Sequence, residues 1–176
     1  MVKKDGLIIG MLIAIISDSH DNIPNIDEGL RLCAEAGVAA LLHCGDVCAP
    51  SVLKYIAEKF PGPIHLVFGN VDGDREKMMA FGLPNVTIHG EQATFELADK
   101  RIGMVHYPDQ ARIMAESGQH DFVFYGHNHK PWVETVGKAR LINPGTLAGL
   151  FAKPTFALYD TATGVLTLKL LYHETV

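Results

Sequence analysis

The 176-residue sequence is poor in cysteine and has no long uninterrupted apolar run and no cluster of basic residues. Its three cysteines, Cys33, Cys44 and Cys48, form an odd and sparse set, which excludes a disulfide framework and favours reduced thiols at small buried positions. Cys44 and Cys48 are spaced as C-x3-C but lack the second pair that a thiolate zinc site requires.

The nearest candidate for a membrane span, residues 7–16, is too short to cross a bilayer and leads into the polar sequence SDSH. Lys3 and Lys4 precede it as in a signal peptide, but no small-residue cleavage site follows. We therefore expect a cytoplasmic protein without membrane contacts.

The formal net charge is −5 and no basic run exceeds two residues, so the sequence lacks the positive surface of a protein that tracks long nucleic acid. A small anion held by local charge remains compatible with it. Hydrophobic residues make up 48% and charged residues 20%, as in globular proteins. The length predicts a single domain over residues 1–176, with residues 1–10 as a candidate N-terminal extension, and it leaves a homo-oligomer open.

The first half of the chain alternates apolar strands with amphipathic helices. We predict strands over residues 12–16, 38–43 and 64–68, and helices over residues 22–37, 50–60 and 72–81. Asp72 or Asp74 is expected to cap the last of these helices. On the first helix the residues that fall near one face are Ile26, Leu30, Cys33 and Ala34.

The second half is rich in hairpins. The pattern predicts paired strands over residues 94–97 and 101–105, 132–136 and 139–142, and 155–159 and 165–171. A short helix over residues 108–117 and a strand over residues 121–125 lie between the first two pairs. We therefore expect an α/β fold, an α+β sandwich of two packed mixed sheets flanked by helices.

Polar side chains follow the predicted strands at the points where these end. They read, in chain order, Asp18-x-His20, Gly45-Asp46, Gly69-Asn70, His106 and Gly126-His127-x-His129. Because the carboxyl ends of strands in open α/β sheets form the ligand crevice, these side chains should converge.

The converging donors form a mixed set of carboxylates, one amide and imidazoles. Such a set suits divalent manganese, iron, zinc, nickel or cobalt, and the seven donors exceed the needs of one tetrahedral ion. Two metal ions are implied. Asp46 could bridge them, and such a pair can hold a hydroxide for an in-line phosphoryl displacement.

These ordered motifs resemble those of the calcineurin-like metallophosphoesterase superfamily, and the size resembles its small phosphodiesterase branch of the YfcE type. The likeness spans roughly residues 12–171. It implies the four-layer architecture of that family and hydrolysis of small phosphodiesters by a hydroxide that bridges two metals. Manganese is the metal expected first. The resemblance assigns one metal to Asp18, His20 and His129, the other to Asn70, His106 and His127, and the bridge to Asp46. Asp46, Asn70 and His106 would then act in catalysis through the hydroxide.

Two positions depart from the family pattern. Many relatives carry a histidine after Gly-Asn, where it can protonate the leaving group, but this chain has Val71. Tyr107 and Pro108 follow His106 where relatives often have glycine. Without a proton donor, esters with good leaving groups are the expected substrates.

Other residues have structural as well as functional interpretations. His43 could orient a metal ligand or be an ordinary core histidine, and Asp72 is read first as a helix cap with a supporting role left open. Asn143 and Thr146 form a turn that could support the site. Residues read as ordinary surface or strand groups are His65, His89, His120 and His173, and those that could touch phosphate but are more often solvated are Arg75, Arg112 and Lys130.

A protein-interaction scaffold is the alternative function, because one eukaryotic branch of the same fold, the vacuolar-sorting scaffold subunit, acts mainly in this way. The missing proton donor at Val71 is compatible with it, whereas a complete set of seven ligand types argues against it. The apolar residues 147–151 could be a contact surface or part of the core.

Overall fold

The computed structural model describes residues 3–4, 7–8 and 10–171 and contains a six-stranded and a five-stranded mixed sheet. The larger sheet has the order β13-β12-β3-β4-β5-β6. Strands β3 (Leu12–Ile16), β4 (Ala40–His43), β5 (Ile64–Leu66) and β6 (Val86–Ile88) run parallel. The helices α1 (Ile23–Ala36), α2 (Pro50–Lys59) and α3 (Arg75–Ala80) connect them. The hairpin of β12 (Thr155–Asp160) and β13 (Leu166–Leu170) adds to β3 in the antiparallel direction.

The smaller sheet has the order β10-β11-β9-β8-β7. It joins the hairpin of β7 (Gln92–Leu97) and β8 (Lys100–Val105) to the hairpin of β10 (Trp132–Val136) and β11 (Ala139–Asn143). Strand β9 (Phe122–Phe124) lies parallel to β8 and β11 and follows helix α4 (Pro108–Glu116). A short antiparallel pair, β1 (Lys3–Lys4) and β2 (Leu7–Ile8), belongs to neither sheet. The rest of the predicted extension over residues 1–10, apart from Gly10, lies outside the described residues.

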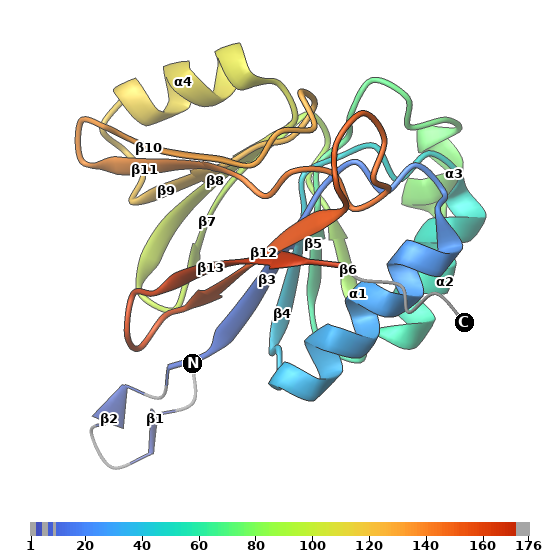
Figure 1. Cartoon of the computed structure of the whole chain (residues 1–176), viewed down its shortest axis with the longest axis horizontal. Coiled ribbons are helices and arrows are strands. Elements are labelled where there is room, and N and C mark those ends of the chain that lie inside the picture. The colour runs from blue at the N-terminus through green and yellow to red at the C-terminus, as the bar shows by residue number, and fades with distance from the viewer. Residues whose placement is uncertain (1–2, 5–6, 9, 172–176) are drawn as a thin grey trace.

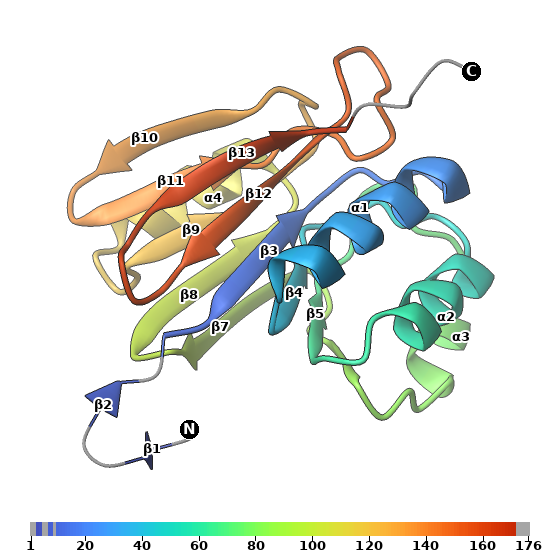
Figure 2. The same ribbon diagram turned by 60° about the horizontal axis from the view of Figure 1, so that its bottom comes forward.

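Three apolar cores separate four layers. Helices α1, α2 and α3 cover the outer face of the larger sheet, and α4 covers the outer face of the smaller one (Figure 1). Side chains such as Ile15, Met104 and Phe124 fill the space between the two sheets. Figure 2 shows the same stacking from a second direction. The predicted fold class, two packed mixed sheets flanked by helices, is confirmed.

The helix ends follow from local sequence. The Asn22 side chain accepts a hydrogen bond from the Asn25 N–H at the start of α1, and Gly37 ends this helix in the left-handed conformation. Pro50 and Pro108 open α2 and α4, where a missing N–H costs nothing. The short loops that result place the carboxyl ends of β3, β4 and β5 along one edge of the sheet.

Some predictions for these elements need correction. Strand β6 was not predicted, because its three residues are too few to show an alternating pattern. Asp74, and not Asp72, caps α3 by accepting a hydrogen bond from the Lys77 N–H. Ala34 is exposed, whereas Gly29 is buried on the inner face of α1.

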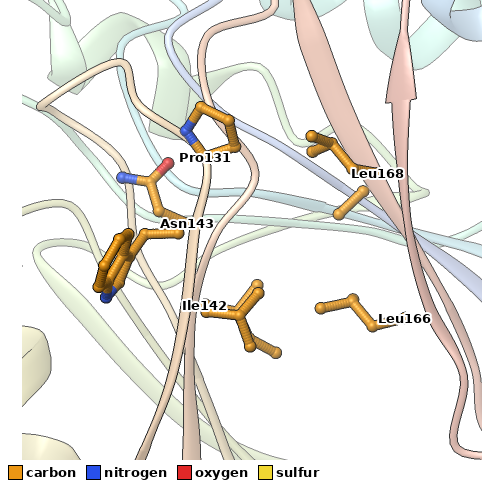
Figure 3. A pocket seen from close by; sticks show the side chains of 8 residues that line it. Pro131, Ile142, Asn143, Leu166 and Leu168 are labelled. Atoms are coloured by element: carbon orange, nitrogen blue, oxygen red, sulfur yellow. The ribbon is translucent and has the colours of Figure 1, made fainter.

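An apolar groove lies between the two sheets at their β10 and β13 edges. Figure 3 shows Pro131, Ile142 and Asn143 on one side of it and Leu166 and Leu168 on the other. None of the seven predicted metal ligands lines this groove. Among the described residues, no helix is both long and apolar enough to cross a membrane.

Candidate metal centre

The predicted ligands lie on the loops that follow β3, β4, β5, β8 and β9. In Figure 1 the loops after β3, β4 and β5 and the loop between β11 and β12 gather above the same end of the sheets. Five of the seven predicted ligands have positive φ angles; they are Asp18 (53°), His20 (42°), Asp46 (61°), His127 (72°) and His129 (59°). Such conformations are uncommon outside glycine and concentrate at functional sites, because the surrounding structure must hold them in place.

The first cluster consists of Asp18, His20 and His129. The Asp18 Oδ1 atom lies 3.1 Å from His129 Nε2 and 3.9 Å from His20 Nε2. The two Nε2 atoms are 3.4 Å apart. His129 Nδ1 is 2.9 Å from the Leu150 carbonyl oxygen, to which it donates, so its Nε2 lone pair faces the cluster.

The second cluster consists of Asn70, His106 and His127. The Asn70 Oδ1 atom lies 3.1 Å from His106 Nε2 and 2.9 Å from His127 Nδ1. His106 Nδ1 is 2.8 Å from the carbonyl oxygen of Cys44, which accepts its proton and fixes the ring. His106 is buried, whereas Asn70 and His127 are exposed, so this cluster opens to solvent.

Asp46 lies between the two clusters. Its Oδ2 atom is 3.8 Å from His20 Nε2 and 3.3 Å from His106 Nε2. Its Oδ1 atom accepts a hydrogen bond from the Val71 N–H at 2.9 Å. One carboxylate oxygen therefore faces an imidazole of each cluster, His20 on one side and His106 on the other.

The donor set fits divalent metal ions. Asp18 Oδ1 is a buried oxygen without a hydrogen-bond partner among the described residues, and it faces imidazole nitrogens. A buried polar atom in this state is costly unless a cation or a proton satisfies it. Two groups of donor atoms, Asp18 with His20 and His129, and Asp18 with Asp46 and His106, each lie within 4.8 Å of one another.

The buried charges of the cluster interact strongly. Burial raises the pKa of Asp18. Burial also raises the pKa of Asp46, but the hydrogen bonds from His106 and Val71 outweigh it and the net pKa lies below the usual value. Burial lowers the pKa of His106, but the hydrogen bond and charge of Asp46 outweigh it and raise the net pKa. A proton on His106 therefore competes with a metal ion for the same nitrogen.

Asp72 holds the backbone of the loops that carry the predicted ligands through hydrogen bonds. Its Oδ2 atom accepts hydrogen bonds from the N–H groups of Asp46 at 2.9 Å and Gly69 at 2.7 Å, and its Oδ1 atom accepts one from Cys48 at 2.8 Å. The preference for Asp72 as a helix cap is therefore wrong, and the supporting role is the one that the geometry shows. The sequence signal was its position two residues after Asn70.

His43 and the turn after β11 also support the ligand loops. His43 is buried and accepts a hydrogen bond from the Gly45 N–H at 3.2 Å, and its Nε2 lies 3.0 Å from Ser19 Oγ. Burial lowers its pKa to about 4. The Asn143 side chain donates to the Gly126 carbonyl at 2.9 Å, and Thr146 Oγ1 donates to the Asp18 carbonyl at 3.0 Å. All three residues hold backbone next to ligands.

Close approach of other groups requires glycine at Gly69 and Gly126, among other positions. A Cβ atom at Gly69 would lie 2.1 Å from Asp46 Oδ1, and one at Gly126 would lie 1.9 Å from Ser17 Oγ and 2.6 Å from Asp18 Oδ2. Gly45 has a positive φ angle of 99°, which glycine adopts without a steric cost. Gly69 and Gly126 make space for the carboxylates of Asp46 and Asp18.

The remaining candidates lie in different surroundings. Arg75 pairs with Glu91 and the Gly69 carbonyl, and Arg112 pairs with Glu134, so both guanidinium groups are engaged. Lys130 is exposed.

The histidines outside the motifs are not all ordinary surface groups. His120 is buried and contacts Thr94 Oγ1 and the Met114 carbonyl oxygen, which corrects its reading as a surface or strand residue. His65 and His89 stack against Phe95. His173 lies outside the described residues.

Comparisons with known proteins agree with this geometry. Residues 11–164 match the model of the calcineurin-like phosphoesterase superfamily domain. Phosphodiesterase MJ0936 of Methanocaldococcus jannaschii is 32% identical over 156 residues, which cover 86% of this chain and 93% of that protein. Phosphodiesterase YfcE of Escherichia coli K12 is 25% identical over 151 residues, 78% of this chain and 80% of that one. The solved structure of a novel archaeal phosphodiesterase has a TM-score of 0.84 and 28% identity, and the match covers 92% of this chain and 100% of that chain.

Proposed function

The chain belongs to the calcineurin-like phosphoesterase superfamily and is a metal-dependent phosphoric ester hydrolase, and we propose that it cleaves small phosphodiesters at a dinuclear metal centre. The observation that carries the proposal is the position of Asp46, whose Oδ2 atom faces His20 of one cluster and His106 of the other. In this proposal Asp18, His20 and His129 hold one ion, Asn70, His106 and His127 hold the other, and Asp46 bridges them.

When bound, two such ions would supply positive charge for the phosphate oxygens and would activate water for attack on phosphorus. The protein's own residues do the rest. Cys44 and Leu150 carbonyls orient His106 and His129, and Asp72 holds the Asp46 and Gly69 backbone. We propose manganese as the first metal to test, as the family resemblance implies, with nickel, iron, zinc and cobalt as alternatives that the same donors suit.

Val71 limits the substrates. Its side chain is 43% exposed beside Asn70 and carries no proton to donate, while its N–H is engaged by Asp46. Diesters with good leaving groups are therefore the proposed substrates, because the departing oxyanion must be stabilised without a side-chain acid. Two dications less two carboxylates and a hydroxide leave a modest positive charge, which suits a diester monoanion.

The test is turnover of a panel of aryl phosphodiesters and monoesters by the reconstituted protein with and without added manganese. We expect metal-dependent hydrolysis of diesters that rises steeply as the pKa of the leaving group falls. A flat dependence on the leaving group would reject the role given to Val71. Absence of metal-dependent turnover of every ester would favour a protein-interaction scaffold instead.

A further inference from the structure

We propose that Phe151 is a stacking platform for a flat aromatic ester group of the substrate, a specificity that rests on the proposed phosphodiesterase function. Its side chain is 96% exposed, although it is large and apolar. Its ring centroid lies 5.6 Å from that of His129. An exposed aromatic face therefore lies next to His129, at the mouth of the metal centre, which is the opening through which the centre faces solvent.

The loop that carries Phe151 is held firmly on both sides. Thr146 and Pro154 form a β-bridge at its base, and the Thr155 N–H donates to the Thr146 carbonyl at 2.8 Å. Leu147 is buried against α1, where the Asn25 side chain donates to the Leu147 and Ala148 carbonyls. The apolar stretch 147–151 is thus divided, with its first two residues in the core and Leu150 and Phe151 exposed.

The exposed end of this loop is tied to the metal centre itself. The Leu150 carbonyl accepts the hydrogen bond that orients His129. Phe151 follows with a φ angle of 61°, which is rare for a bulky residue. The backbone that carries the ring is therefore held in place before substrate arrives, which lowers the conformational entropy lost on stacking.

The chemistry of the mouth favours a flat apolar group over a second anion. Leu150 and Val71 are 42% and 43% exposed, and the ring of Tyr107 packs against His127 at 4.9 Å. Of the three cations considered for phosphate contacts, Arg75 and Arg112 are paired with carboxylates, and Lys130 is exposed. A diester bound at the metal centre has a second substituent besides its leaving group, and an aromatic one would gain the face of Phe151.

A substituent on this platform does not take part in bond cleavage. Its contact is the same in the bound substrate and in the transition state, so it changes KM and leaves kcat nearly unchanged. Loss of an aromatic stacking partner weakens binding by roughly tenfold. This split separates a platform from a residue that merely supports His129, because misplacing His129 would alter metal content and kcat.

The experiment compares diesters that share the leaving group p-nitrophenol and differ in the second substituent, which is methyl, phenyl or thymidine 5′. The proteins are wild type and the Phe151→Ala, Phe151→Leu and Phe151→Tyr variants, all loaded with manganese. Ile113→Ala is the matched control, because Ile113 is 68% exposed on α4.

We expect Phe151→Ala to raise KM for the phenyl ester roughly tenfold and to leave KM for the methyl ester unchanged. Phe151→Tyr should behave as wild type and Phe151→Leu should be intermediate. A parallel rise for the thymidine ester assigns the platform to nucleosides, and a rise for the phenyl ester alone assigns it to aryl groups.

Direct binding provides a readout independent of turnover. Calorimetry with diphenylphosphinate and dimethylphosphinate, monoanions that cannot be hydrolysed, should show a roughly tenfold loss for Phe151→Ala with the diphenyl compound alone. Equal affinity of wild type and Phe151→Ala for diphenylphosphinate overturns the platform. If no ester is turned over but the phosphinates still differ, the proposed function fails while the platform stands.

Discussion

The substitution Asp72→Asn tests whether one carboxylate fastens the ligand loops. Asp72 is 7% exposed and accepts three backbone hydrogen bonds. Asparagine has the same shape but one acceptor oxygen. If this oxygen serves Asp46 and Gly69, the amide group faces the Cys48 N–H and leaves that buried donor without a partner.

The structure sets the size of the effect. A buried donor without a partner costs about 1–3 kcal/mol, and each of the two remaining bonds loses about 1 kcal/mol when its acceptor loses its charge. We therefore expect the free energy of unfolding of the metal-free protein to fall by about 3–5 kcal/mol. Metal affinity should fall by about 10–100-fold, as for other partners that orient ligands from outside the coordination sphere.

Urea unfolding of the metal-free protein and competitive titration with manganese measure the two effects. Asp74→Asn is the matched control, because Asp74 makes one exposed capping bond to the Lys77 N–H and asparagine caps a helix about as well as aspartate. It should change neither quantity. Wild-type stability and metal affinity in Asp72→Asn would refute the role assigned to this carboxylate.

Three further predictions concern the bridge, the missing acid and a buried histidine. Asp46→Asn should lower kcat/KM more than any other single ligand substitution, by at least about 100-fold, which exceeds the ~10–100-fold loss typical for residues that only orient a ligand. Unchanged activity and metal content in this variant would contradict the bridging role of Asp46. Val71→His should raise turnover of diesters with poor leaving groups by up to roughly 100-fold and that of good ones far less, and equal effects on both would be inconsistent with a missing proton donor. Burial lowers the pKa of His43 to about 4, whereas in the unfolded chain the pKa of histidine is about 6.5. Between pH 6.5 and 4 the unfolded chain therefore binds a proton that the folded protein does not, and the free energy of unfolding falls by up to about 3 kcal/mol as the pH drops through this range. Urea unfolding of wild type and His43→Gln at several pH values measures the contribution of His43. If the free energy of unfolding depends on pH in the same way in both proteins, His43 is not buried in its neutral form.

The convergence of the polar residues that follow β3, β4 and β5 was predictable because two rules act together, although β5 ends at Leu66 and not at the predicted residue 68. Apolar runs that end in polar residues mark the strands, and parallel strands bring their carboxyl ends to one edge. Asp18, Asp46 and Asn70 are therefore brought together although they are far apart in sequence. The hairpin of β7 and β8 was also visible, because Ala98 and Asp99 interrupt two alternating runs and both adopt positive φ angles.

What the sequence could not predict depends on contacts between loops. Asp72 supports Cys48 and Asp46, 24 and 26 residues away, and its position after Asn70 left a supporting role open without revealing these partners. Within residues 147–151, Leu147 is buried because it packs against Gly29, whereas the end of the segment is exposed. Because the whole segment consists of small and apolar residues, its sequence does not show where the core ends. Strand β6 is too short for periodicity and forms because β5 offers it a free edge.

Anomalous diffraction from crystals of the manganese-loaded protein tests the dinuclear centre most directly. Two peaks are predicted, one among Asp18, His20 and His129 and one among Asn70, His106 and His127, with the Asp46 carboxylate contacting both. A single peak, or a second peak away from Asp46, would contradict the account.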